Sequence, residues 1–226
     1  MARWQWLAER AARTVLGRFP ITVIPNGIDL AVYQPRDRQQ AKAALEVPQD
    51  RFCFLFFAAN LSDPRKGVQR LVKTLRQFGM PSNSVLLLVG NGSDELAKQL
   101  PGLPVISAGY IGDPERIAEC LSAADCMLLL SEADNLPYTA IEAAACGCPT
   151  IAVAVGGIPE EIKDKENGRL LARTSQPEEL ASLMREFAAM SHQEWTQMSR
   201  NCRDKLDQRF SGTAFIRSYE SFFQRL

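Results

Sequence analysis

The sequence has 226 residues, 46% of them hydrophobic, which is enough to build one large domain or two small ones around a real core. Lysine plus arginine and aspartate plus glutamate are balanced at 26 each, so no net positive field indicates a nucleic-acid partner. The single histidine excludes a histidine-rich zinc site and argues against a Ser-His-Asp triad, and neither a membrane-spanning apolar run nor a signal peptide is visible.

The six cysteines show no CxxC spacing, and most of them fall in apolar segments. They are Cys53, Cys120, Cys126, Cys146, Cys148 and Cys202. This usage predicts reduced, buried thiols in a cytosolic protein, with disulfides as the less favoured alternative.

The opening segment, Met1 to Phe19, combines apolar residues such as Trp4, Trp6 and Leu7 with four arginines. It predicts an amphipathic basic helix. A helix of this kind either lies on a membrane surface or packs on a neighbouring domain, and we favour the second interpretation. Without that domain, its apolar face is expected to lack a packing partner.

The first buried strand is expected at residues 52–57, after a short helix near residues 42–45. A polar turn, residues 60–67, follows the strand and opens a helix over residues 68–78. The turn carries Arg65 and Lys66. The carboxyl end of a strand in an open α/β sheet is where ligand groups bind, so this basic pair is a candidate anion site. A surface charge pair is the alternative.

Two further strands are expected at residues 85–89 and 105–107. The first ends at Gly90-Asn91-Gly92, where glycine permits a tight turn and a close approach of ligand. The second leads through Gly109-Tyr110-Ile111 into a helix over residues 114–123. Tyr110 is equally compatible with an ordinary half-buried aromatic residue.

The most informative stretch is residues 131–147, which follows a short apolar strand at residues 126–130. Asn135 is a favourable helix N-cap, Pro137 suits a first turn, and Gly147 is typical of a C-terminal cap. The free amides at such a helix start form an anion site.

Two carboxylates accompany this anion site, Asp134 just before the helix and Glu142 on it. Carboxylates accept hydrogen bonds from hydroxyl groups, so a ligand with both phosphate and polyol groups, a nucleotide sugar, would suit the combination. The alternative is that Asp134 is a capping residue and Glu142 a solvated helix charge.

The rest of the chain continues the alternation of strand and helix. We expect a strand at residues 150–154, a glycine turn at 156–157, a short helix from Pro159, a strand at 169–171, a helix at 178–190, and a helical tail to Leu226 broken once at residues 211–212. This alternation predicts parallel βαβ units and an α/β fold.

The acidic pair Asp134 and Glu142, separated by seven residues, resembles that of the retaining GT-B glycosyltransferases of the group 1 type, family four. The segment from Cys146 to Ala152 and the glycine turn from Val155 to Glu160 also resemble that family. The resemblance implies a Rossmann-like parallel sheet flanked by helices, the C-terminal half of a GT-B fold. Residues 21–226 would be the donor-binding domain, and residues 1–20 a remnant of the interdomain region.

The same resemblance implies roles for individual residues. Lys66, with Arg65 beside it, would hold the donor's diphosphate, Asp134 the transferred sugar and Glu142 the ribose hydroxyls. Further donor-binding residues would be Asn60, Gly90, Asn91, Tyr110, Ile111, Asn135, Leu136, Pro137, Tyr138 and Thr139. The sequence departs from the family at Ala59-Asn60, where a Gly-Arg pair is usual, so that one phosphate-binding cation is missing unless Arg65 replaces it.

The resemblance implies a hexosyltransferase-type enzyme that transfers sugar from a nucleotide-diphosphate sugar with retention, without metal or cofactor, in polysaccharide or glycoconjugate synthesis. The acceptor would be a sugar or lipid-linked molecule, and the location cytoplasmic or peripheral at the inner face of the membrane. Two alternatives remain. The chain is a nucleotide-sugar-binding module completed by a partner chain that supplies the N-terminal acceptor domain, or it is a phosphate-binding α/β protein that takes no sugar.

Overall fold

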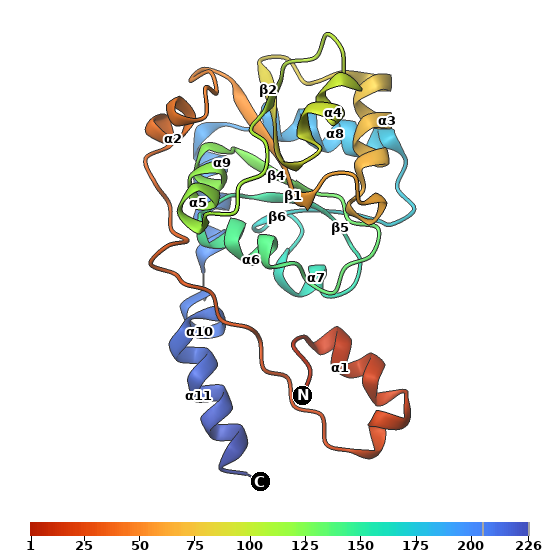
Figure 1. Ribbon diagram of the computed structural model, residues 1–226, viewed down its shortest axis with the longest axis vertical. Helices are drawn as coiled ribbons and strands as arrows, with labels where there is room; N and C mark the ends of the chain where they lie inside the picture. Colours follow the sequence, from red (N-terminus) through yellow and green to blue (C-terminus); the bar gives the residue numbers. More distant parts are fainter. Residues whose placement is uncertain (205, 226) are drawn as a thin grey trace.

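The computed structural model describes residues 1–204 and 206–225, and Lys205 and Leu226 of the expected helical tail lie outside the described residues. Six parallel strands in this part of the chain form one sheet (Figure 1). They are β1 (Phe52–Asn60), β2 (Ser84–Asn91), β3 (Val105–Ser107), β4 (Cys126–Leu129), β5 (Thr150–Val153) and β6 (Gly168–Leu171). The predicted α/β class with a parallel sheet is confirmed.

Both faces of the sheet are buried, which explains why its strands are continuous apolar runs rather than alternating ones. On β1, Cys53 and Leu55 join the core on one face, and Phe54 and Phe56 join the core on the other. Helices α2 (Arg38–Ala44), α5 (Pro114–Ala123) and α6 (Tyr138–Ala145) cover the first face. Helices α3 (Val68–Phe78), α4 (Ser93–Lys98) and α8 (Pro177–Ala188) cover the second (Figure 1). The sequence analysis did not predict α4.

The strand order is β3-β2-β1-β4-β5-β6, so the chain changes direction across the sheet between β1 and β4. These two strands are hydrogen-bonded neighbours, with Phe54 opposite Cys126 and Leu55 opposite Met127. The loops that leave their carboxyl ends therefore diverge to opposite faces and leave a crevice between them. Open α/β sheets bind ligands at such a switch point.

Helix α6 ends as the sequence predicts, at Gly147. This residue has φ +70°, its amide donates to the carbonyl of Ala144 (3.0 Å), and the amide of Cys148 donates to the carbonyl of Ala143 (2.8 Å). The pair of bonds is a Schellman motif, which requires a left-handed residue and so favours glycine.

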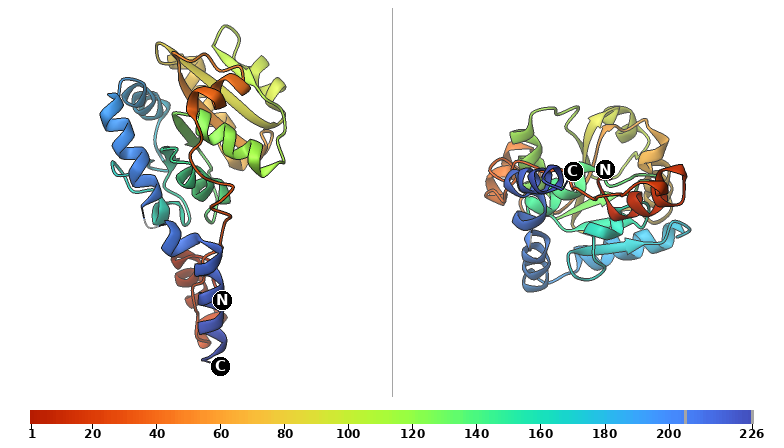
Figure 2. Two further views of the ribbon diagram at one scale, coloured as in Figure 1. Left: turned by 90° about the vertical axis from the view of Figure 1, so that its left-hand side faces the viewer. Right: turned by 90° about the horizontal axis from the view of Figure 1, so that it is seen from below.

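The chain ends lie outside the sheet layers. Helices α1 (Gln5–Ala12) and α11 (Gly212–Phe223) project from the same end of the domain (Figures 1 and 2). Helices α7 (Ile158–Glu161), α9 (His192–Arg203) and α10 (Leu206–Phe210) complete the described α-helices, and Pro64–Lys66 forms a 3-10 turn between β1 and α3. The expected helix to Phe19 is shorter than predicted, because α1 ends at Ala12 and residues 15–18 form a separate 3-10 turn. The tail also breaks after Arg203, not only at Ser211.

Helix α1 packs on this domain itself. Trp4 is 3% exposed, and its ring lies 5.7 Å from that of Phe210. The expectation that Trp4 lacks a packing partner is therefore wrong. The exposed large apolar residues of the segment are instead Met1, Val15, Leu16 and Phe19.

The start of α1 is fixed by Glu160 of α7. The carboxylate of Glu160 accepts hydrogen bonds from the amides of Gln5 (3.0 Å) and Trp6 (2.7 Å). These are first-turn amides without an acceptor inside the helix, and a carboxylate there also interacts favourably with the helix dipole. Glu160 thus connects α1 to the glycine turn that precedes α7.

All six cysteines are free and buried, as predicted. Burial raises the pKa of the Cys53 and Cys120 thiols to about 12 and that of Cys126 well above its ordinary value. Among the described helices, none has the length and apolar character needed to span a membrane.

Candidate functional site

Lys66 and Asp134 meet at the switch point of the sheet. Lys66 follows β1 and Asp134 follows β4, and the Nζ of Lys66 lies 2.9 Å from Oδ2 of Asp134. Both side chains are partly buried, with 31% of Lys66 and 16% of Asp134 exposed. The second oxygen of Asp134 accepts from the amide of Asn135 (2.9 Å), which fixes the carboxylate. A cation and an oriented carboxylate therefore share the crevice.

The two loops are locked together by backbone contacts. The amide of Glu132 donates to the carbonyl of Arg65 (2.8 Å), and Arg70 of α3 pairs with Glu132 (3.0 Å). Gly67 adopts φ +79°, and a Cβ atom there would overlap the carbonyl of Leu130. Only glycine allows this close approach, which places Lys66 over the end of β4.

Arg65 is directed away from this pair. Its guanidinium bonds to Asp63 (2.7 Å to Oδ2), and its side chain is 73% exposed. The interaction with Arg65 holds the pKa of Asp63 below its ordinary value. The structure thus brings Lys66, but not Arg65, next to Asp134.

Asn60, Gly90 and Asn91 lie at the carboxyl ends of β1 and β2. Asn60 is opposite Asn91 in the register, and its Oδ1 accepts from the amide of Ser62 (2.8 Å). Gly90 has φ +142°, and a Cβ atom there would overlap the carbonyl of Ala58. The glycine at this position is explained by the close approach of the two chain segments.

The start of α6 differs from the prediction. The N-cap is Pro137, not Asn135, and helix geometry begins at Tyr138. Asn135 lies two residues before that N-cap, and its Oδ1 accepts no hydrogen bond from the residues that the structure describes, so it does not cap α6. The first-turn amides without an acceptor in the helix are therefore those of Tyr138 and Thr139. Leu136, just before the helix, is buried in the core.

The glycine turn at Gly156 and Gly157 packs against the loop that carries Asp134 and Asn135. The amide of Gly157 donates to the carbonyl of Asn135, and a Cβ atom on Gly156, which has φ +58°, would overlap the carbonyl of Asp134. These contacts therefore fix the position of the loop that carries Asp134. Its glycines are needed for contact with that loop.

Glu142 is largely buried on α6 and faces Tyr33. Burial raises the pKa of Glu142, and the hydrogen bond from the Tyr33 hydroxyl partly offsets this effect. Tyr33 is 8% exposed, and burial together with Glu142 raises its pKa. A solvated helix charge, the alternative interpretation, does not describe Glu142. The sequence analysis missed Tyr33, because nothing in the local pattern connects it to α6.

Tyr110 and Ile111 follow β3, on the far side of β2 from the switch point. Tyr110 is 59% exposed and Ile111 is half-buried. The alternative interpretation of Tyr110 as an ordinary half-buried aromatic is therefore wrong, and its side chain is open to a ligand that reaches this end of the sheet.

A pocket of about 710 Å³ opens beside Asp134, and we call it the α1 pocket. Four segments surround it: the loop that follows β4, the turn before α7, helix α1, and the segment that follows β6. Its lining residues are Trp6, Leu7, Arg10, Glu132, Ala133, Asp134, Asn135, Val155, Gly156 and Arg173. Trp6, Arg10 and Arg173 were not predicted as site residues, because the packing of α1 brings the first two to Asp134 and the pairing of β6 with β5 brings the third.

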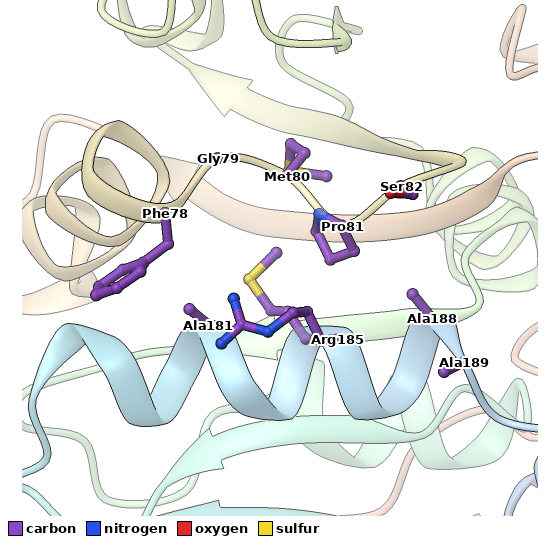
Figure 3. Close-up of a pocket in the computed structure, with 10 residues that line it drawn as sticks. Phe78, Gly79, Met80, Pro81, Ser82, Ala181, Arg185, Ala188 and Ala189 are labelled. Carbon is purple, nitrogen blue, oxygen red and sulfur yellow. The ribbon is translucent and has the colours of Figure 1, made fainter.

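A second hollow lies between the loop after α3 and helix α8 (Figure 3). Phe78, Met80 and Pro81 face Ala181 and Ala188 across it. This loop leads into the amino end of β2, so the hollow lies away from the carboxyl ends of the strands. It is separate from the candidate site.

The family model for glycosyl transferases group 1 matches residues 53–189, more than half of the chain. The chain belongs to this family. The match includes Lys66, Asp134 and Glu142, and it excludes α1 and the C-terminal helices.

Individual members of the group 1 family agree with this assignment. The D-inositol 3-phosphate glycosyltransferase of Actinosynnema mirum is 32% identical over 172 residues, which cover 69% of this chain and 41% of that protein. The sucrose-phosphate synthase of Thermosynechococcus elongatus superposes with a TM-score of 0.84 at 26% identity, covering 99% of this chain and 57% of that one. The Anabaena protein HepE, in complex with UDP and glucose, superposes with a TM-score of 0.82 at 24% identity, covering 100% of this chain and 62% of that one.

The chain thus spans less than two thirds of the length of each of these proteins. At 24% identity, the likeness to HepE shows the fold alone. The fold is that of GT-B glycosyltransferase structures, as the sequence predicts.

Proposed function

We propose that this chain is the donor-binding domain of a retaining glycosyltransferase that uses a nucleotide-diphosphate sugar. The observation that carries the proposal is the Lys66–Asp134 pair at the switch point, with the half-buried Glu142 on the helix that follows. A diphosphate needs cations or amides, a ribose needs acceptors for its hydroxyl hydrogens, and a sugar needs an oriented carboxylate. The site offers each of these groups. HepE, which shares the fold, is described in complex with UDP and glucose.

In this proposal, Lys66 and the amides of Tyr138 and Thr139 bind the diphosphate, and Asp134 binds the sugar. Transfer breaks the bond between the anomeric carbon and the diphosphate oxygen and forms a bond from that carbon to an acceptor hydroxyl oxygen. The acceptor's proton passes to the leaving diphosphate. Lys66 and the amides stabilise the developing negative charge, a role that a metal ion fills in other enzymes, so we propose catalysis without metal or cofactor.

Glu142 is proposed to accept hydrogen bonds from the ribose. A partly desolvated carboxylate has lost some contact with water, so hydroxyl groups that replace water bind it favourably. The hydroxyl group of Tyr33 interacts with this carboxylate and lowers its pKa. Whole-protein properties, namely the acceptor domain, a role in polysaccharide or glycoconjugate synthesis and a cytoplasmic or membrane-peripheral location, belong to the same proposal.

The experiment is a calorimetric titration of the chain with UDP, GDP, ADP and their glucose conjugates. We expect at least one pair to bind. With the best nucleotide, Glu142→Ala should weaken binding by roughly 1.5–3 kcal/mol, the range for hydrogen bonds to charged groups. The 2′,3′-dideoxy form of that nucleotide should bind wild type and variant equally. The proposal would be contradicted if no nucleotide of the panel bound. It would also be contradicted if Glu142→Ala weakened the binding of the ribose nucleotide and of its 2′,3′-dideoxy form equally.

The second candidate is a nucleotide-sugar-binding module that becomes active only with a partner chain. We consider it because the described residues form a single six-stranded sheet, and this sheet carries the proposed donor site. We expect donor binding by the isolated chain and negligible sugar transfer. Turnover by the purified monomer would contradict this candidate and leave the donor site intact.

A further inference from the structure

Arg70 on α3 connects two loops at the carboxyl edge of the sheet. In the described part of the chain, its guanidinium group donates four hydrogen bonds. Nε and Nη2 donate to Oε1 of Glu132 (3.1 and 3.0 Å) in the loop that follows β4. Nη1 donates to the carbonyl of Ser175 (2.8 Å) and Nη2 to that of Arg173 (2.8 Å), both in the loop that follows β6. One side chain thus ties both loops to α3.

Only an arginine can make this set of contacts. Its guanidinium group offers five N–H donors in a rigid plane, whereas the ammonium group of a lysine donates from a single point. The Arg70 side chain is 11% exposed, so its charge is largely withdrawn from water and needs the partners that it has. A neutral side chain at this position would leave the carboxylate of Glu132 and two backbone carbonyls without this donor.

The Arg70–Glu132 pair runs alongside the Lys66–Asp134 pair. Lys66 lies four residues before Arg70, and Asp134 lies two residues after Glu132. Both pairs therefore join the same two segments, the chain around the start of α3 and the loop that follows β4. The two pairs differ in how a ligand affects them. A diphosphate that binds Lys66 competes with Asp134 for the ammonium group, whereas Arg70 is occupied by contacts inside the protein.

We propose that Arg70 is a positioning residue for sugar transfer, acting through Glu132 on the loop that carries Asp134. It keeps that loop fixed when a diphosphate draws Lys66 away from Asp134. The inference rests on the proposed function, because it takes Asp134 as the residue that binds the transferred sugar. Misplacing a group at a reacting centre by about 1 Å can cost on the order of 100-fold in rate. A second attachment of the loop, independent of Lys66, protects the alignment of Asp134.

The test compares a nucleoside diphosphate with its glucose conjugate. UDP, GDP, ADP and their conjugates are titrated by calorimetry, and the pair that binds best is used. Contacts of Lys66 with the diphosphate affect both ligands, so the ratio of the two affinities isolates the contribution of the sugar. Asp134→Asn should shift this ratio against the conjugate. Arg70→Gln should shift it in the same direction by about fivefold, because a loosened loop no longer holds Asp134 at the sugar.

A double-mutant cycle shows whether Arg70 acts through Asp134. In the Asp134→Asn background, Arg70→Gln should change the affinity ratio by less than about twofold, because no carboxylate is left to position. An equal shift in both backgrounds would overturn the inference, since the two residues would then act independently. Arg70→Lys should behave like Arg70→Gln. Full rescue by lysine would overturn the bridging role, because charge alone would then suffice.

Glu132→Ala tests the same connection from the loop that follows β4. This variant keeps Arg70 and its bonds to the carbonyls of Arg173 and Ser175. It should shift the affinity ratio in the same direction as Arg70→Gln, and it decides the question if Arg70→Gln proves too unstable to purify. An unchanged ratio in Glu132→Ala would contradict the inference. Circular dichroism of every variant establishes that each one is folded.

Hydrogen exchange of the ligand-free protein provides a readout that needs no ligand. Arg70→Gln should speed amide exchange about tenfold in residues 130–136 and 172–176, while exchange in β1 stays at the wild-type level. Arg76→Gln is the matched control, since Arg76 is exposed on the same helix and donates to the carbonyl of Gln99 (3.0 Å). Loss of protection throughout the sheet, or the same response in Arg76→Gln, would indicate a general loss of stability and refute the positioning role.

The Asp134→Asn titration separates this inference from the proposed function. If Asp134→Asn shifts the affinity ratio while the Arg70 and Glu132 variants leave it unchanged, only the positioning role is refuted. If no nucleotide of the panel binds, or if Asp134→Asn leaves the ratio unchanged, the proposed function is refuted in that respect and the inference falls with it.

Discussion

Lys66 Nζ and Asp134 Oδ2 lie 2.9 Å apart although 68 residues separate them in the sequence. The pair joins the first loop of the sheet to the loop across the switch point. Asp134 holds the ammonium group of Lys66 in place and accepts a hydrogen bond from the amide of Asn135, so the amides of Tyr138 and Thr139 at the start of α6 stay free. A diphosphate that enters the crevice therefore meets a cation whose position is already fixed.

Lys66→Ala should weaken the binding of a nucleoside diphosphate much more than that of the bare nucleoside. The variant removes the cation and leaves the carboxylate of Asp134 to repel the phosphates. We expect a loss of roughly 1.5–3 kcal/mol for UDP, or about 10- to 150-fold. Calorimetry with UDP and uridine measures the difference.

Arg65→Ala is the control and should change UDP affinity less than about twofold, because Arg65 is exposed and engaged with Asp63. Equal losses for UDP and uridine would place Lys66 away from the phosphates.

Glu142→Gln should stabilise the ligand-free protein at neutral pH. Burial raises the folded pKa of Glu142 above its ordinary value of 4.5, so the native state binds a proton that the unfolded chain releases. The contribution of protonated Glu142 to the free energy of unfolding is therefore complete below pH 4.5. It is lost as the pH rises through the pKa of Glu142 in the folded state. Urea unfolding from pH 4 to pH 8 should show the variant gaining over wild type as the pH increases. Exposed Glu166→Gln should show no such trend, and a flat difference for Glu142→Gln would refute the prediction.

Gly67→Ala should be far more destabilising than Gly102→Ala. Both glycines have positive φ, +79° and +77°, so both substitutions carry the backbone strain of about 1 kcal/mol. Gly102 has open space around its Cβ position, whereas at Gly67 the new atom would overlap the carbonyl of Leu130. Thermal unfolding measures the contrast. Equal melting temperatures would mean that the loops adjust without cost.

Glu160→Ala should release the start of α1. The amides of Gln5 and Trp6 lose their acceptor, so hydrogen exchange over residues 5–12 should become faster, while exchange in β1 stays unchanged. Mass spectrometry of deuterated peptides gives the readout. Glu166→Ala serves as the control. Protection of residues 5–12 at the wild-type level would show that Trp4 and Phe210 alone hold the segment.

The sheet and its helices were predictable because their signals are local. The helices at residues 68–78 and 114–123 were predicted with the observed bounds, since Gly79 marks the end of the first, Pro114 marks the start of the second, and apolar residues recur at helical spacing in both. Gly147 marked the end of α6 in the same way. Helix α4 was missed because it has only six residues, too few to show a helical period.

The site was predictable only in part. Asp134, Lys66 and Glu142 were proposed from the resemblance, and the topology explains how the first two meet. Tyr33 escaped prediction because its contact with Glu142 depends on long-range packing. Asn135 was misassigned as the N-cap because its residue type suits that position, whereas the helix begins only at Tyr138, with Pro137 as its N-cap.

The burial of every cysteine has a practical consequence for observing motion in this molecule. Thiols with raised pKa values and no access to solvent are largely inert toward maleimide reagents near neutral pH. A single cysteine introduced at exposed Arg13, just beyond α1, could therefore be labelled with a fluorophore without first removing the native ones. With a second label on α8, energy transfer would report in real time whether α1 moves toward the sheet when ligand arrives.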